Sequence, residues 1–404
     1  MIEARTSGFG AALLERWRAQ PAVVRRVIWP AAIVAYLLQV GVAADAPYSA
    51  YDLRPVWLAA NAFIHGGDPY FVSDVTPFLY PPGSLVFLAP FGGLPWVLAR
   101  GGYFVFEVLA VPLGLGLTIA AMRRPVVSVV GAGMLLGLAL FEPATSALVL
   151  HNFTVVSFLG MALYLWLAAR DRWTWAAVAL GVALTLKPLM PLLILHAILF
   201  RRWRSALVAT AIPVVLSLIV LPMVAGERFE QAMRFLVSNE VGGTVSASLV
   251  TLGVHLGLPP VLTLVVRVLL FAVIVWTARR IARRPGEPDV VSIETAGVLM
   301  LAQLLCFSIT WTHYGLLLVP WLATIVADRS LMRKPLVVAG AVVVAIGAET
   351  IATQFGFSYA ATLSMTVGLL LMTAGVVAAA LASPSAGARA EPGEDVSVSP
   401  RSPA

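Results

Sequence analysis

Residues 261–275 read VLTLVVRVLLFAVIV, an apolar run in which Arg267 is the one charged residue. Similar runs recur along the chain of 404 residues, which is 60% hydrophobic and 12% charged. A soluble domain carries about 25% charged residues, so this chain has roughly half the charge needed to cover a soluble surface. Because the runs do not alternate in polarity as barrel strands do, and a membrane helix needs about 20 residues, the sequence predicts an all-α, polytopic membrane protein.

Basic residues predict the topology, since Lys and Arg concentrate in cytoplasmic loops and account for a net charge of +7. Two longer gaps, 45–99 and 225–258, contain few basic residues and are expected outside, as a catalytic loop and a second periplasmic loop. The segment 81–95 is rich in Pro and Gly and too short to cross the membrane. Treating it as a juxtamembrane or re-entrant segment keeps every basic cluster on the cytoplasmic side. The clusters are Arg25-Arg26, Arg123-Arg124, Arg170 with Arg172, Arg201-Arg202 with Arg204, Arg279 to Arg284, and Arg329 with Arg333-Lys334.

Counting the crossings needed to keep every basic cluster in the cytoplasm gives about twelve spans. Both termini are then cytoplasmic, and we expect the membrane to be the plasma membrane. We expect a cytoplasmic arm at 1–26, a membrane domain at 27–382 and a disordered tail at 383–404 that is rich in Ser, Pro and Gly. The expected spans are 27–44, 100–122, 125–141, 153–169, 174–186, 188–200, 205–225, 260–278, 295–311, 314–327, 335–351 and 358–382.

The pair 174–186 and 188–200 is too short for two full crossings and predicts a hairpin that reaches partway into the membrane. Broken backbone at that depth is tolerated where it lines a cavity, so the tip, Leu186-Lys187-Pro188, should do so. Lys187 is one of only two lysines in the chain. A charge inside the bilayer indicates either an anion site, here for phosphate, or a structural lysine that pairs with a carboxylate or reaches the interface.

The first outside loop holds most of the other candidates. Apolar residues between Pro55 and Ile64 follow helical spacing and predict a helix at the membrane interface, with Asp52 near its N-terminus. Asp52 can act as a general base towards a hydroxyl group, or it can cap the helix or pair with Arg54. Further candidates in this loop are Trp57, Asp68 and Tyr80.

Glu142, Asn152 and His313 are candidates at the outer ends of later spans. His313 stands among aromatic residues, where a sugar ring could stack or a phosphate could accept a proton; a histidine that caps a helix is the simpler alternative. The sequence has no Gly-rich phosphate loop, no His/Cys cluster with metal spacing and no Gly-x-Ser-x-Gly elbow. We therefore expect no metal and no cofactor. If the protein is a membrane transferase, it lacks a nucleotide site and would need a lipid-borne activated donor.

Several of these features occur together and in order: an outside Asp after the first span, a Gly-x-Asp-x-Tyr turn, Tyr-Pro-Pro before a short helix, and a Lys-Pro hairpin tip. In this the chain resembles the polyprenyl-phosphate-dependent glycosyltransferases of the GT-C superfamily, specifically glycosyltransferase family 87. The similar segments are Ile28–Ala32, Asp52–Trp57, Tyr80–Gly83, Ala89–Gly92, Leu184–Pro188 and Trp203–Val208.

Within that family the segments are most similar to the arabinofuranosyl-transferring members of mycobacteria and corynebacteria. The resemblance implies transfer of D-arabinofuranose from decaprenyl-phosphoryl-arabinose, on the periplasmic face, to the arabinan of cell-wall arabinogalactan or lipoarabinomannan with α-(1→3) branching. Asp52 falls on the family's general base. At the position of His313 the arabinosyl members carry Tyr and the mannosyl members carry His, so polyprenyl-phosphate-mannose is the alternative donor.

The expected reaction is an inverting displacement. Asp52 deprotonates the acceptor, Lys187 with His313 and Arg54 stabilises the phosphate, and Tyr80 and Trp57 shape the sugar site. A lipid-linked saccharide transporter is an alternative of another class, in which key charges gather at the midplane without a base at one mouth. A catalytically silent membrane scaffold is the third alternative. Nothing in the sequence predicts a nucleic-acid partner or an oligomeric state.

Overall fold

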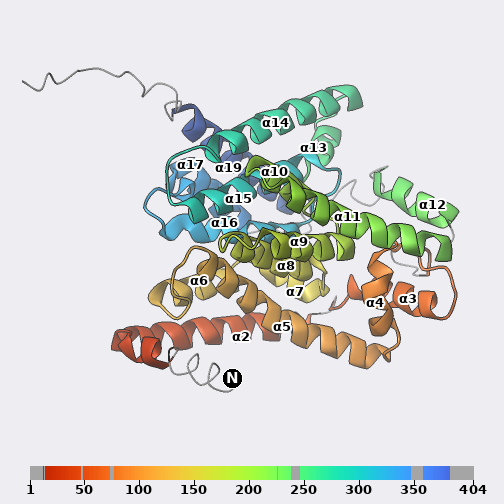
Figure 1. Cartoon of the computed structure of the whole chain (residues 1–404), viewed down its shortest axis with the longest axis horizontal. Coiled ribbons are helices and arrows are strands. Elements are labelled where there is room, and N and C mark those ends of the chain that lie inside the picture. Colours follow the sequence, from red (N-terminus) through yellow and green to blue (C-terminus); the bar gives the residue numbers. More distant parts are fainter. Residues whose placement is uncertain are drawn as a thin grey trace, which may run out of the picture.

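The fold was analysed in a computed structural model, which describes residues 12, 14–46, 49–72, 77–224, 226–237, 246–346 and 358–382. These residues form helices and connecting turns without a β-strand, as the sequence predicts (Figure 1). The α-helices are α2 (Trp29–Asp45), α3 (Leu53–Ile64), α4 (Ser84–Gly92), α5 (Trp96–Ala121), α6 (Val129–Ala139), α7 (Glu142–Leu150), α8 (Thr154–Ala168), α9 (Trp173–Leu186), α10 (Leu192–Leu199), α11 (Trp203–Val220), α12 (Gly226–Val237), α13 (Leu249–His255), α14 (Pro260–Ile281), α15 (Pro288–Cys306), α16 (Val319–Leu322), α17 (Pro335–Ile346) and α19 (Ser358–Ala382). A π-helical turn, η1 (Val24–Ile28), precedes α2, and the 3₁₀ helices are η2 (Leu221–Met223), η3 (Thr312–Leu318), η4 (Ala323–Val326) and η5 (Leu331–Arg333).

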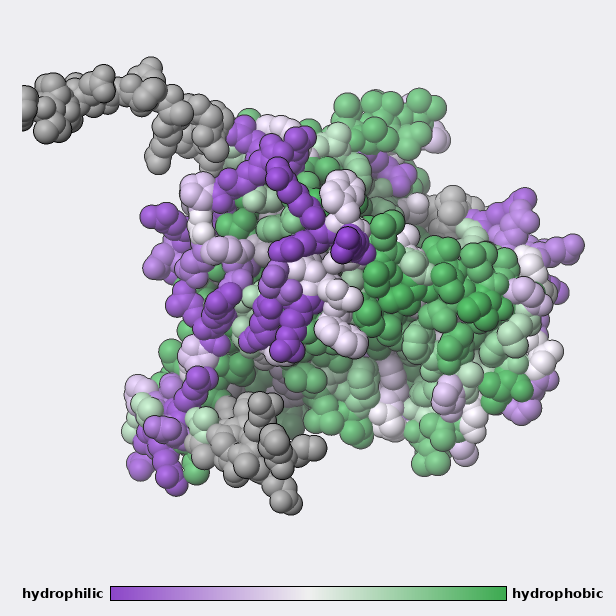
Figure 2. Space-filling view, viewed as in Figure 1, coloured by the Kyte–Doolittle hydropathy of each residue, from purple (hydrophilic) through white to green (hydrophobic). Residues whose placement is uncertain are grey.

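The helix surfaces are those of a membrane protein. Leu207 on α11 and Val261 on α14 are 70% and 73% exposed, together with many apolar neighbours. Large exposed apolar surfaces are costly in water, so these side chains face lipid. Hydrophobic residues cover the middle of the face in Figure 2, and hydrophilic ones gather on its left side and right edge. The chain is therefore a multi-pass membrane protein.

Six helices of the described residues are long and apolar enough to cross a membrane, or seven if α6 and α7, bent by 62°, count as one span. Four shorter apolar helices, at 154–168, 173–186, 312–326 and 335–346, coincide with other expected spans. The total of twelve remains a prediction. Three helices were not expected from the sequence, α7, α12 and α13, which have at most 12 residues each.

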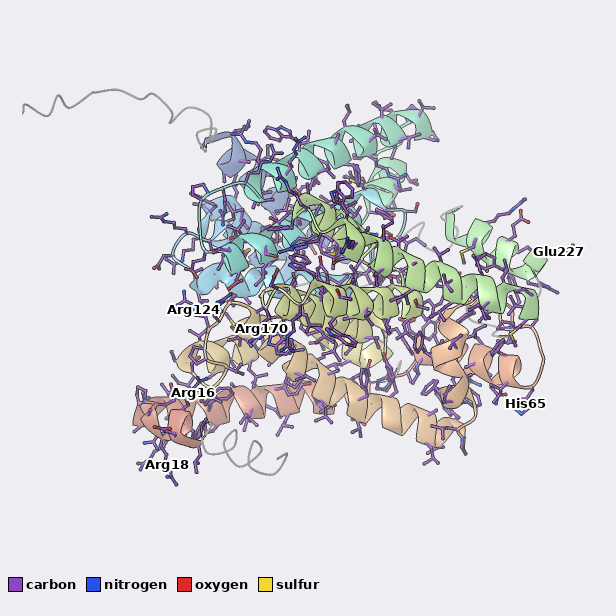
Figure 3. All side chains as sticks on the ribbon, viewed as in Figure 1. Arg16, Arg18, His65, Arg124, Arg170 and Glu227 are labelled. Atoms are coloured by element: carbon purple, nitrogen blue, oxygen red, sulfur yellow. The ribbon has the colours of Figure 1, made fainter. Side chains whose placement is uncertain are left out.

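The loops with basic clusters meet at one end of the molecule. Arg123 lies 2.6 Å from the carboxylate of Asp289 and donates to the carbonyl of Ala169, while Arg202 lies 2.6 Å from Asp171. The two polar gaps meet at the other end, where Tyr70 packs against Phe229 of α12 with ring centroids 5.5 Å apart. Figure 3 shows Arg16, Arg18, Arg124 and Arg170 at one end and His65 and Glu227 at the other. The arm up to residue 11, residue 225, residues 238–245 and the tail after 382 lie outside the described residues.

The segment 45–99, which the sequence predicts to be an outer loop, folds onto itself through α3 and α4 in its described residues. As expected, α4 is too short to span, with nine residues between Gly83 and Gly93. A Cβ atom on Gly92 would lie 2.4 Å from the Ala60 carbonyl carbon, so only glycine lets the two helix backbones touch there. Asn61 fastens the crossing by donating to the Gly92 carbonyl at 2.9 Å. This small core fixes the direction in which the residues before α3 point.

Candidate active site

A cavity of about 590 Å³ lies where the outer loop meets the membrane helices. Asp52, Tyr80, Asn152, Lys187 and His313, all candidates from the sequence, line it together. They come from the turn before α3, the segment before α4, the α7–α8 turn, the α9–α10 hairpin tip and η3. The hairpin tip therefore lines a cavity, as predicted. The other lining residues are Tyr51, Pro55, Val56, Pro77, Phe78, Leu79, Leu150, Pro188, Leu189, Gln303, Phe307, Ser308, Ile309, Trp311, Thr312 and Tyr314.

Asn152 joins the two charged residues of this cavity. Its Nδ2 donates a hydrogen bond to the Asp52 carboxylate, and its Oδ1 accepts one from the Lys187 ammonium group. The same Oδ1 accepts from the Thr154 backbone N–H at 2.9 Å and from the Thr154 hydroxyl at 2.7 Å. Because Asn side chains readily bond the backbone two residues on, the turn that starts α8 fixes the amide orientation.

Asp52 stands at the position that begins α3, but its side chain makes no capping hydrogen bond. Its backbone N–H donates to the Leu150 carbonyl at 3.1 Å, which ties the outer loop to the end of α7. Burial raises the pKa of the Asp52 carboxyl, and the nearby Lys187 charge and the Asn152 bond lower it to a smaller extent. The carboxylate faces Asn152, and neither the capping role nor the Arg54 pairing is found.

Lys187 follows α9 directly, because Pro188 cannot continue a helix and leaves Lys187 in an extended conformation. The side chain is 3% exposed, with Nζ 4.9 Å from the centroid of the Tyr314 ring and 5.7 Å from that of Tyr80. Within the described part of the chain, no carboxylate oxygen lies within 4.0 Å of Nζ. A structural ion pair therefore does not account for this buried cation.

Two polar atoms in the cavity wall, Nε2 of His313 and Oε1 of Gln303, are buried without a hydrogen-bond partner among the described residues. The His313 ring is 3% exposed and lies between Trp311 and Tyr314, with centroids 5.7 Å and 4.8 Å away. Trp311 and Tyr314 belong to the aromatic run that drew attention to His313. Gln303 was missed, although a glutamine inside an apolar span was a signal that could have found it.

Four candidates lie outside the cavity. Arg54 is exposed on α3, and Trp57 donates from Nε1 to the Leu94 carbonyl at 3.0 Å. Asp68 accepts the Tyr70 backbone N–H at 3.0 Å within its turn, and Glu142 is the first residue of α7. None of the four lines the cavity that holds Asp52 and Lys187.

A buried carboxyl–imidazole pair lies behind the site. Nδ1 of His151 is 2.6 Å from Oε2 of Glu107, and Nε2 of His151 is 3.1 Å from the Ser49 hydroxyl. His151 has a left-handed conformation with φ +49°, which few residues other than glycine adopt, and it immediately precedes Asn152. The sequence offered no partner for Glu107. This pair holds the turn that presents Asn152 to the cavity.

An apolar groove of about 820 Å³ adjoins the cavity. It runs between α4, α5, α8 and α9, and the wall includes Phe153 and Leu186, the chain neighbours of Asn152 and Lys187. The Phe153 ring also lies 5.9 Å from that of Tyr80 in the cavity. The cavity that holds Asp52 and Lys187 and the apolar groove therefore meet at the Phe153 ring. The described residues contain no group of three or more His, Cys, Asp or Glu that could hold a metal ion.

Comparison with known proteins gives consistent matches. Residues 78–308 match the model of glycosyltransferase family 87. The α-(1→3)-arabinofuranosyltransferase of Mycobacterium tuberculosis is 30% identical over 346 residues, which is 81% of this chain and 79% of that protein. The enzyme of the same name from Corynebacterium glutamicum is 24% identical over 315 residues, or 76% of this chain and 75% of that one.

Among solved structures, ArnT from Cupriavidus metallidurans bound to undecaprenyl phosphate matches with a TM-score of 0.41 and 19% identity, covering 89% of this chain and 77% of that one. The family model spans more than half of the chain, and it includes Tyr80, Asn152 and Lys187. The chain belongs to glycosyltransferase family 87, and it is a glycosyltransferase.

Proposed function

We propose that this enzyme transfers D-arabinofuranose from decaprenyl-phosphoryl-arabinose to cell-wall arabinan, with inversion and in α-(1→3) linkage, at the outer face of the plasma membrane. The observation that carries the proposal is the bridge Asp52–Asn152–Lys187, which holds a carboxylate and a cation on one cavity wall. A glycosyl phosphate needs both groups, a base for the incoming hydroxyl and a positive charge for the departing phosphate. The names of the similar arabinofuranosyltransferases support the sugar.

Asp52 is the proposed base. Its carboxylate opens on the cavity, and the Asn152 amide leaves one oxygen, Oδ1, without a hydrogen bond among the described residues. Burial raises the pKa of Asp52, which makes its carboxylate a stronger proton acceptor than an exposed aspartate. The acceptor hydroxyl would lie against this oxygen.

Lys187 is the proposed phosphate ligand. The Lys187 ammonium group is buried and forms its hydrogen bonds with neutral oxygen atoms of Asn152 and Thr154. It has lost its hydration, so an anion in the cavity regains the lost electrostatic stabilisation. The rings of Tyr80 and Tyr314 stabilise the cation while the cavity is empty of phosphate. His313 can donate a second hydrogen bond to the phosphate or to the sugar when Nε2 carries the proton.

The apolar groove is the proposed seat of the polyprenyl chain. It begins beside Phe153 and Leu186, so a phosphate at Lys187 would place its lipid tail at the groove entrance. A chain of isoprene units is apolar along its length and suits walls made of Phe, Leu, Val and Ala side chains. One donor molecule can thus occupy both compartments.

The displacement then proceeds in one step. Asp52 takes the proton of the acceptor hydroxyl, whose oxygen forms a bond to the anomeric carbon as the bond from that carbon to the phosphate oxygen breaks. The electron pair of the broken bond stays on polyprenyl phosphate, where Lys187 stabilises the added charge. Attack from the face opposite the phosphate inverts the configuration.

The position of the site supports an outward orientation. Residues of the first polar gap, from Tyr51 to Tyr80, line the cavity. Figure 3 shows His65 and Glu227 of the two polar gaps at one end, and Arg124 and Arg170 of the basic loops at the other. The positive-inside rule puts the basic end in the cytoplasm, together with both termini. Extracellular arabinan would then reach Asp52 directly.

The decisive experiment gives the purified enzyme, in lipid nanodiscs, decaprenyl-phosphoryl-arabinose or decaprenyl-phosphoryl-mannose with a synthetic arabinan acceptor. We expect arabinosyl transfer and an α-(1→3) linkage in the product, determined by linkage analysis. His313, buried in the cavity, favours the mannosyl alternative, so mannosyl transfer alone would replace the proposed sugar. Movement of intact lipid-linked sugar across the membrane without transfer would favour a transporter.

A further inference from the structure

Gln303 is a buried glutamine whose side chain has no hydrogen bond with the described part of the chain. It lies near the end of α15, is 6% exposed and lines the cavity, with Oε1 buried and unpaired. Buried polar groups are almost always hydrogen-bonded, because an unpaired one loses its hydration without compensation. The Gln303 amide therefore lacks a hydrogen-bond partner, which a ligand in the cavity could supply.

The rest of α15 shows that this helix satisfies its buried polar groups where it can. Glu294 is bonded to Arg284, to the Ser330 hydroxyl at 2.9 Å and to the Leu331 backbone N–H at 2.6 Å. The hydroxyl of Thr295 donates to the Val291 carbonyl at 2.7 Å. Gln303 differs from both by facing the cavity, and leucines stand next to it at 301, 304 and 305. A leucine at 303 would fit this helix without an unpaired polar group.

The chemistry of an amide selects its ligand. A phosphate oxygen only accepts hydrogen bonds at neutral pH, so it cannot satisfy the acceptor Oε1. A hydroxyl group both donates and accepts, and so does an amide with its carbonyl and NH₂ groups. Of the parts of a lipid-phosphate sugar, only the sugar ring carries hydroxyl groups. Lys187 has the complementary preference, since an ammonium group only donates.

We propose that Gln303 is a sugar-recognition residue, whose amide forms a hydrogen bond with one hydroxyl group of the donor sugar while Lys187 binds the phosphate. This assignment rests on the proposed function, since it presumes a glycosyl phosphate in the cavity. It divides donor recognition between two elements, the hairpin tip for the phosphate and α15 for the sugar. Through Gln303 the enzyme then distinguishes the sugar-bearing donor from the product, polyprenyl phosphate without a sugar.

The test compares full-length wild type with Gln303→Leu in detergent micelles, by thermal melting with decaprenyl phosphate or decaprenyl-phosphoryl-arabinose. Wild type should be stabilised more by the sugar-bearing lipid. Gln303→Leu should keep the stabilisation by decaprenyl phosphate and lose the additional part, with kcat/KM for transfer reduced about tenfold to a hundredfold by the missing hydrogen bond. Without ligand the variant should melt no lower than wild type, because it removes an unpaired buried amide.

Deoxy donors, each lacking one hydroxyl group of arabinose, identify the contact. One of them should be a poor substrate for wild type, yet Gln303→Leu should use it nearly as well as the full donor. The control is Gln39→Leu. Gln39 is also buried, with its Oε1 unpaired among the described residues, but its Nε2 donates to the Leu138 carbonyl at 3.3 Å and the Thr145 hydroxyl at 2.9 Å, away from the cavity. That variant should melt lower and leave the response to the sugar unchanged.

The outcomes separate this inference from the proposed function. If wild type responds to the sugar and Gln303→Leu responds equally, or loses the same factor with every deoxy donor, the role of Gln303 is refuted while the function stands. If wild type neither binds nor transfers arabinose, the proposed function fails, and the same comparison with decaprenyl-phosphoryl-mannose decides the role of Gln303. Failure with both donors refutes both proposals.

Discussion

The side-chain amide of Asn152 donates a hydrogen bond to the carboxylate of Asp52. Because the carbonyl end of the same amide accepts from Lys187, one neutral group connects a base and a cation without letting them form a direct ion pair. A direct pair would neutralise both groups and block the space between a hydroxyl and a phosphate. The proposed reaction therefore depends on the placement of Asn152.

Asp52→Asn should abolish transfer while the protein stays folded. Loss of a general base slows a reaction by about a hundredfold to ten-thousandfold. Since burial raises the pKa of Asp52, its ionised form destabilises the folded state at a pH above that pKa, and the neutral amide should melt at the same or a higher temperature. Transfer from radiolabelled donor and thermal melting measure the two effects. Asp68→Asn is the matched control outside the cavity, and an active Asp52→Asn enzyme would remove Asp52 from the mechanism.

The pH profile of kcat/KM should have an acid limb above the ordinary aspartate pKa of about 3.9. The ionised base is the active form, so a raised pKa makes activity decline at a higher pH as the solution is acidified. Asn152→Ala removes a hydrogen bond that favours the ionised form, which should raise the pKa of Asp52 further and move the limb to higher pH. Initial rates across a pH series give the position of this limb. Gln39→Ala is the control, because Gln39 is a buried amide away from the cavity. An unchanged limb in Asn152→Ala would contradict the bridge.

Lys187→Met should weaken use of the donor. The side chains are similar in length, so the change removes the charge and its hydrogen bond to Asn152 while keeping most of the packing. We expect kcat/KM for the donor to fall about tenfold to a hundredfold, as for the loss of a charge-assisted hydrogen bond of about 1.5–3 kcal/mol. Lys334→Met is the control, because Lys334 is the only other lysine and belongs to the basic loops. Equal kinetics in the two variants would show that Lys187 does not bind phosphate.

Val182→Trp should block long-chain donors selectively. Val182 lines the apolar groove on α9 and is half-buried, so an indole there would occupy the space proposed for isoprene units. A decaprenyl donor should lose activity, while a donor with a short prenyl chain should keep it. Competition between the two donors in detergent gives the ratio of short-chain to long-chain donor use. Leu264→Trp, on the exposed face of α14, should leave that ratio unchanged, and a Val182→Trp enzyme with the wild-type ratio would place the lipid elsewhere.

Glu107→Ala should lower both stability and kcat, whereas Glu107→Gln should preserve most of each. Alanine leaves Nδ1 of the buried His151 ring unpaired, which costs about 1–3 kcal/mol, and frees the turn that positions Asn152. Glutamine can still accept from Nδ1 of His151. The KM for the donor should change little in either variant, because Lys187 is untouched. Melting curves and steady-state kinetics measure these effects, and equal loss in the two variants would show that the pair does not act through its hydrogen bond.

Hydropathy predicted the long helices well because lipid allows few other backbone conformations. A spanning backbone must satisfy its hydrogen bonds internally, so long apolar runs such as 260–278 become helices such as α14. The short helices were harder to predict. α7 has nine residues between Phe141 and His151, and its ends depend on Pro143 and on a left-handed residue that no hydropathy window detects.

Rarity of charge also pointed to two of the residues that line the cavity. A charged group in an apolar chain needs a reason, and this directed attention to Asp52 and Lys187 before any geometry was available. The same reasoning overlooked Gln303, since an uncharged amide in an apolar span attracts less notice. It also ranked Arg54 and Glu142 with the others, because their exposure and direction depend on packing.

The sequence by itself determined that the chain lies in a membrane, where its long apolar helices form and which polar residues are unusual. These properties depend on local composition and on the length needed to cross lipid. Only the tertiary structure decided which of those residues act together. Asp52 and Asn152 are 100 positions apart, and Asn152 and Lys187 are 35 apart. They meet because Gly92 lets α3 and α4 touch, Pro188 ends α9 beside the cavity, and Glu107 holds the α7–α8 turn. Such contacts arise from packing between distant segments, which no local pattern of residues specifies.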